Sequence, residues 1–74
     1  MKVTVKLFAT LQTGRFDIKE MDCRENISIE ELMKELEIKE GDYFITFVNN
    51  RHADYDKKLS EGDLLSVFPP IGGG

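Results

Sequence analysis

The chain has 74 residues, 41% of them apolar and 32% charged, which is the size of one small domain with a modest core. Ten basic and fourteen acidic residues give a net charge of −4, which disfavours nucleic acid and anionic membranes as partners because both require a basic patch. The single cysteine, Cys23, excludes an internal disulfide, so we expect a cytoplasmic protein. No stretch approaches the roughly 18 apolar residues of a membrane helix.

Residues 2–8 alternate between apolar and polar side chains, which predicts a β-strand. Val3, Val5 and Leu7 share one face, and Phe8 is an apolar exception on the opposite, polar face. The following residues, 9–15, are predicted to form a loop with a turn at Gly14.

A second strand is predicted over residues 16–23, forming a hairpin with the first. Phe16 and Ile18 would share one face of this strand, and Met21 and Cys23 the other. We therefore expect a bulge or bend between the two pairs.

Residues 28–38 carry a helical pattern. Ser28 is a typical N-cap, and Glu31 three residues later completes a capping box. The apolar positions recur at helical spacing and predict one buried stripe, made of Ile29, Leu32, Met33 and Leu36. Gly41 is the expected stop signal.

Two more strands and a weaker segment follow. Residues 43–48 are aromatic and β-branched, and Asn49-Asn50 suits a tight turn after them. Residues 51–59 predict at most a short edge strand, and residues 64–68 a final strand with Leu65 and Val67 on one face. Phe68 falls on the other face, as Phe8 does in the first strand.

The predicted order is therefore β-β-α-β-(β)-β, an α+β chain with a four- to five-stranded sheet. One helix covers only one face of such a sheet, so apolar side chains on the opposite face require another explanation. This order of elements is that of the β-grasp, or ubiquitin-like, fold. We assign residues 1–68 to this domain and residues 69–74 to a flexible tail.

Catalytic and metal-binding motifs are absent from the sequence. It has neither of the glycine-rich phosphate-binding patterns, and Cys23 and His52 are too few for a zinc site. Cys23 is expected to pack as a small hydrophobe and His52 to be a solvated loop residue. We therefore expect no enzyme, no metal site and no bound cofactor.

The last seven residues, "FPPIGGG", form an unusual tail. Pro69 and Pro70 cannot donate to a strand ladder, so the sheet is expected to release the chain after Phe68. Ile71 follows, and Gly72, Gly73 and Gly74 have no side chains, so they fit a slot no wider than a backbone. This suggests a terminal carboxylate that enters the active site of another protein, although a frayed end or cloning remnant is the alternative.

The whole chain resembles the MoaD/ThiS family of ubiquitin-like sulfur carriers. The resemblance lies in "KLFATL" after a basic start of the first strand, in "VNN" before a short loop, and in "LSEGDLLSVFPPIGGG" at the end. The prolines favour the molybdopterin synthase small subunit, whereas the additional Gly72 is similar to the thiamine carrier. In this fold the first and last strands pair in parallel, which would bring Phe8 and Phe68 together as one partly exposed patch.

The resemblance also implies a reaction cycle and partners. An E1-like adenylating enzyme would use ATP to activate the Gly74 carboxylate, and a sulfur donor enzyme would convert it into a thiocarboxylate. The tail would then enter the large catalytic subunit of molybdopterin synthase, or thiazole synthase. Phe8, Phe68 and residues 69–71 match the family's partner-binding surface, but "RHADY" replaces an apolar residue that the family often has after the Asn turn.

Four readings remain open from the sequence. The carrier would serve molybdopterin, with molybdenum or tungsten as the metal, or it would serve thiamine thiazole or another sulfur-containing product. It would otherwise be a ubiquitin-like modifier joined through Gly74 to lysines, or a plain interaction domain.

Overall fold

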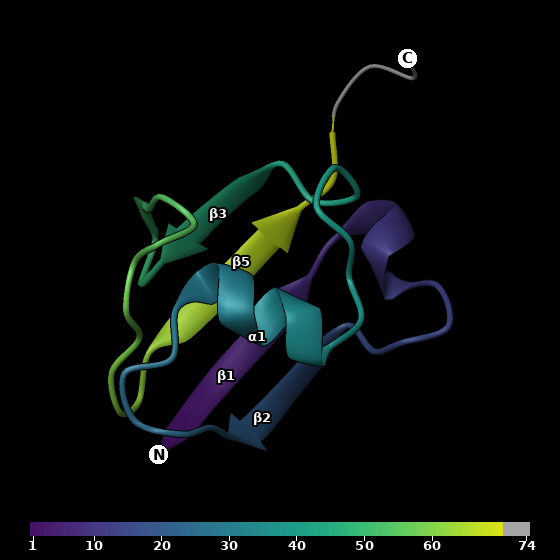
Figure 1. The fold of residues 1–74 in the computed structure, drawn as a ribbon. Coiled ribbons are helices and arrows are strands. Elements are labelled where there is room, and N and C mark those ends of the chain that lie inside the picture. The colour runs from purple at the N-terminus through teal and green to yellow at the C-terminus, as the bar shows by residue number, and fades with distance from the viewer. Residues whose placement is uncertain (71–74) are drawn as a thin grey trace.

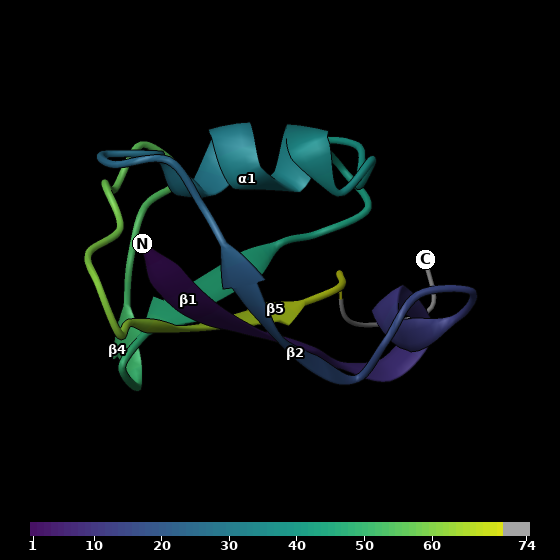
Figure 2. The ribbon, with the colours of Figure 1, turned by 90° about the horizontal axis from the view of Figure 1, so that it is seen from below.

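The computed structural model describes residues 1–70. A five-stranded mixed sheet has the order β2-β1-β5-β3-β4, and helix α1 packs across one of its faces (Figures 1 and 2). In chain order the elements are β1 (Lys2–Leu7), the 3-10 helix η1 (Ala9–Gln12), β2 (Ile18–Asp22), α1 (Ile29–Glu35), β3 (Ile45–Val48), β4 (Arg51–His52) and β5 (Leu64–Phe68). This architecture is the predicted β-grasp fold.

The two terminal strands lie side by side at the centre of the sheet. β1 and β5 pair in parallel, with a register that runs from Thr4 opposite Leu64 to Leu7 opposite Val67. The expected pairing is thus confirmed. Phe8 and Phe68 each lie one residue beyond the last pair of this ladder, so they lie at the same end of the sheet.

The β1–β2 hairpin differs from its prediction in two ways. The register is continuous from Lys2 opposite Asp22 to Lys6 opposite Ile18, so the expected bulge is wrong. Phe16 precedes the strand instead of belonging to it, which allows its half-buried side chain to pack against the core without a bulge. The loop before it contains η1, which the sequence did not indicate.

Helix α1 begins as predicted but ends early. The Ser28 hydroxyl accepts the Glu31 N–H at 3.2 Å, and the Glu31 carboxylate accepts the Ser28 N–H at 2.9 Å, which completes the capping box. The helix ends before Glu37, which has a positive φ of 60°, and the Ile38 N–H donates to the Met33 carbonyl. This is a typical helix-terminating bond pattern, so the helix does not extend to residue 38. Gly41 also has a positive φ, of 99°, but lies beyond this helix end.

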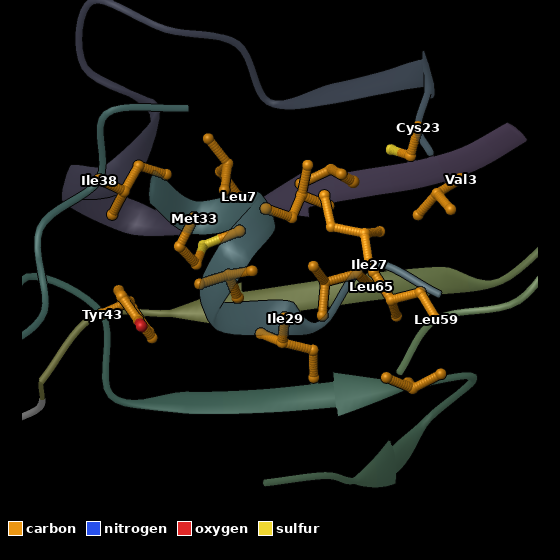
Figure 3. Packing of buried hydrophobic residues seen from close by; sticks show 14 of the residues in the cluster. Val3, Leu7, Cys23, Ile27, Ile29, Met33, Ile38, Tyr43, Leu59 and Leu65 are labelled. Carbon is orange, nitrogen blue, oxygen red and sulfur yellow. The ribbon is translucent and has the colours of Figure 1, made fainter. Parts of the chain in front are cut away.

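The core lies between α1 and the covered face of the sheet (Figure 3). All five strand residues predicted for that face are fully buried: Val3, Val5, Leu7, Leu65 and Val67. The helix contributes the three buried residues of its predicted stripe, and Leu36 at its end is half-buried. Cys23 joins the core as a small apolar side chain, as expected.

The turn between β3 and β4 takes the predicted form. Asn49 and Asn50 have positive φ angles of 52° and 69°, the conformation of a tight hairpin turn. β4 then pairs for only two residues, with His52 opposite Phe47 and Arg51 opposite Val48. Beyond these pairs, the Ala53 N–H donates to the Thr46 carbonyl, and β3 otherwise pairs with β5.

Candidate functional site

Two aromatic side chains meet on the sheet face that α1 leaves uncovered. The Phe8 and Phe68 rings stack with centroids 4.1 Å apart and planes 11° from parallel. The Phe8 N–H donates to the Val67 carbonyl at 3.1 Å, which continues the parallel ladder beyond β1. Both rings are half-buried. The expected partly exposed patch is therefore present.

An apolar groove surrounds this stack. Its volume is about 450 Å³, and its walls are formed by Phe8, Ala9, Phe44, Ile45, Phe47, Phe68, Pro69 and Pro70. Phe47 meets Phe68 edge to face, with centroids 5.7 Å apart and planes at 87°. Apolar surface of this kind on a small domain commonly marks a site where another protein binds.

Phe44 and Phe47 belong to this groove but were not among the predicted site residues. β3 pairs with β5 so that Ile45 lies opposite Phe68 and Phe47 opposite Ser66, on the uncovered face. Phe44 precedes the strand and is 56% exposed. The alternation in "YFITFV" separates Phe47 from the core positions, but only the β3–β5 register shows that it reaches Phe68.

The tail leaves the sheet at the same groove. The Phe68 carbonyl accepts the Phe44 N–H at 2.8 Å, and the two residues that follow are prolines, which cannot donate to a ladder. Pro69 is half-buried and Pro70 exposed, and both line the groove. Ile71, Gly72, Gly73 and Gly74 lie outside the described residues. The predicted tail therefore begins, at Pro69 and Pro70, within the groove that contains Phe8 and Phe68.

Two polar side chains border the groove. The Lys6 ammonium lies 5.2 Å from the Phe8 ring centroid, and the His52 ring meets Phe47 edge to face at 6.0 Å. Arg51 lies opposite Val48, whose side chain is on the covered face. Of the two polar residues that replace the family's apolar position, only His52 therefore adjoins the groove.

Within residues 1–70, the other titratable side chains do not form a candidate metal site. No group of three or more metal-ligating side chains occurs there. Cys23 is buried, and burial raises the pKa of its thiol, whereas His52 is exposed on β4. A larger hollow of about 770 Å³ lies beside the β3–β4 turn, but charges of both signs line it and the tail root does not. Among the described residues, no helix is long and apolar enough to span a membrane.

Similar proteins share this fold over their full length. A structure from Pyrococcus furiosus, provisionally named molybdopterin converting factor subunit 1, is 28% identical with a TM-score of 0.75, covering 96% of this chain and 99% of its own. A complex of subunits 1 and 2 of the molybdopterin-converting factor from Helicobacter pylori matches at 25% identity and a TM-score of 0.68, with both chains fully covered.

A third structure, small archaeal modifier protein 1 from Haloferax volcanii, is 20% identical with a TM-score of 0.77, covering 95% of this chain and 98% of that one. At this identity the likeness concerns the fold alone. No curated protein matches the chain. The model of the ThiS family matches residues 5–74. The chain is therefore a member of the ThiS family of ubiquitin-like sulfur carriers.

Proposed function

We propose that this protein carries sulfur on Gly74 for molybdopterin biosynthesis. The observation that supports this most directly is the apolar groove at the root of the glycine tail, in a chain of the ThiS family. A groove of aromatic side chains supplies docking energy, and a tail without side chains reaches a narrow active site. Residues 1–68 would act as the docking domain and residues 69–74 as the delivery arm.

Gly74 would pass through two chemical steps on partner enzymes. A free carboxylate is a poor electrophile, so an adenylating enzyme would first join it to AMP from ATP, with release of pyrophosphate. Sulfide supplied by a donor enzyme would then attack the acyl carbon, and AMP would leave with the electron pair of the broken bond. The product is a thiocarboxylate, whose sulfur is a good nucleophile. We assign catalysis to these partners, with the carrier itself non-catalytic and cytoplasmic.

The acceptor is proposed from the nature of the neighbouring structures. The Helicobacter pylori structure is a complex of subunit 1 with subunit 2 of a molybdopterin-converting factor. By analogy, the groove of this chain would bind a large catalytic subunit, where the tail would deliver sulfur to a pterin precursor. Phe8, Phe68, Pro69, Pro70 and Ile71 would make the contact, and Gly72 and Gly73 would enter the active site.

Intact-mass measurement tests the proposal. The protein is incubated with ATP, its adenylating enzyme and a sulfur source. We expect a gain equal to the mass difference between sulfur and oxygen, localised to Gly74, and its loss when subunit 2 and the pterin precursor are added. Loss only to thiazole synthase would identify a thiamine carrier, and amide bonds to lysines would identify a modifier. No activation of Gly74 by any adenylating enzyme would refute the carrier function.

A further inference from the structure

Tyr55 occupies an unusual place beside the groove. Its hydroxyl donates a hydrogen bond to the Phe44 backbone carbonyl. Its ring meets the ring of Tyr43 edge to face, with centroids 4.9 Å apart and planes at 69°. Tyr43 is only 5% exposed and belongs to the core. The core therefore holds the Tyr55 ring, and the hydroxyl is directed at the chain just before β3.

The need for this bond follows from the short length of β4. The Ala53 N–H donates to the Thr46 carbonyl at 3.0 Å, on the edge of β3 that faces β4. β4 pairs only with Phe47 and Val48, so it does not extend along the edge as far as Phe44. The Tyr55 side chain supplies the hydrogen bond there that an edge strand would otherwise supply.

Phe44 is consequently bound from both sides. Its carbonyl accepts from Tyr55, and its N–H donates to the Phe68 carbonyl at 2.8 Å. Phe68 is the last residue of β5, and its ring forms the floor of the groove against Phe8. The exposed Phe44 ring forms part of the wall. One tyrosine hydroxyl thus fixes a segment that bonds to the tail root and carries a wall of the groove.

We infer that Tyr55 is a positioning residue, which acts through Phe44 to hold the groove in its binding-competent shape. The inference rests on the proposed function. A surface that is already ordered loses little conformational entropy when the partner binds, and this preorganisation favours affinity. Tyr55 itself need not contact the partner for this effect, and it is not among the side chains that line the groove.

A Tyr55→Phe variant tests the inference because it removes the hydroxyl and leaves the ring. In adenylation assays with ATP and the cognate adenylating enzyme, we expect the KM for the carrier to rise about three- to tenfold, the cost of ordering one segment. We expect kcat to change less than twofold, because the tail that reacts is unaltered. Tyr43→Phe is the matched control, since it removes a neighbouring hydroxyl that makes no hydrogen bond to Phe44, and its KM should equal that of the wild type.

Amide hydrogen exchange provides a readout that does not depend on enzyme activity. The Phe44 N–H should exchange several-fold faster in Tyr55→Phe than in the wild type or in Tyr43→Phe, because its segment opens more often. An unchanged Phe44 exchange rate, or an unchanged KM with a wild type that is adenylated, would overturn the inference. A wild type that is never adenylated refutes the proposed function instead, and the exchange rates then still decide whether Tyr55 holds Phe44.

Discussion

Phe8 and Phe68 lie near opposite ends of the chain, yet their rings stack with centroids 4.1 Å apart on the sheet face that α1 does not cover. The parallel pairing of β1 with β5 brings them together, since each follows the last residue pair of that ladder. The same pairing places the root of the glycine tail beside an apolar groove. In the proposed function, this pairing would couple the binding of a partner to the delivery of the tail.

Replacement of Phe68 by aspartate should weaken binding to the adenylating enzyme or to subunit 2. A half-buried aromatic residue at the centre of a contact surface commonly contributes about 2 kcal/mol or more to binding. Isothermal titration calorimetry measures this loss, and circular dichroism checks that the fold persists. Ile18→Asp is the matched control: Ile18 is 54% exposed and does not line the groove, so this variant should bind as the wild type does. Unfolding of Phe68→Asp would instead make Phe68 a core residue.

Deletion of Gly74, or replacement of Gly73 by valine, should abolish adenylation. A Cβ atom at position 73 would collide with a slot shaped for a glycine backbone. Both variants should retain the wild-type Tm because a glycine tail is expected to add few contacts to the folded domain. Pyrophosphate release measures the first effect and differential scanning calorimetry the second. Full activity of Gly73→Val would contradict the insertion of a narrow tail.

Ser28→Ala should lower the free energy of unfolding by about 1 kcal/mol, the usual cost of losing an N-cap. The Ser28 hydroxyl accepts the Glu31 N–H, and alanine leaves that donor without its partner. Urea denaturation measures the change. The groove lies at the opposite face of the sheet, so partner affinity should be unchanged. A loss of affinity equal to the loss of stability would show that the helix start and the groove are coupled.

Glu31 should make stability fall in acid. Hydrogen bonds from the Ser28 N–H and the Arg24 guanidinium lower the pKa of the Glu31 carboxyl from 4.5 to about 2. The Glu31 carboxyl therefore binds a proton more readily in the unfolded chain than in the folded one. Its contribution to the free energy of unfolding is complete above pH 4.5 and is lost as the pH falls toward 2. In urea denaturation between pH 6 and pH 2, Glu31→Gln should show a shallower decline than the wild type. Parallel curves for the two proteins would contradict this role.

The Cys23 thiol should react slowly in the folded protein. It is 8% exposed, and burial raises its pKa, so little thiolate is available for attack. Alkylation by iodoacetamide at pH 8, followed by mass spectrometry, should be at least about tenfold slower than in the urea-denatured chain. A rate equal to that of the denatured chain would show that the thiol is accessible in the folded protein.

Several features of this protein were readable from the sequence because they depend on local patterns. The strict alternation of residues 2–8 fixed which face of β1 is buried, and Ser28 with Glu31 marked the start of α1. The positive φ angles at Asn49-Asn50 follow from the preference of asparagine for that conformation. The order of these elements predicted the fold class, and the isolated Phe8 and Phe68 on polar faces predicted an exposed patch.

The tertiary structure decided what local patterns do not encode. Helix α1 ends through Glu37, a residue without the usual stop signature, because a specific bond from Ile38 to Met33 closes it. The regular β1–β2 register depends on β2 starting at Ile18, after Phe16, and the residue types around Phe16 did not show this start. Phe44 and Phe47 join the site only because β3 pairs with β5, a segment distant in sequence. Tyr55 joins it through the hydrogen bond from its hydroxyl to the Phe44 carbonyl. The contacts of Phe44 and Phe47 depend on the register between β3 and β5, and the sequence of either strand alone does not specify that register.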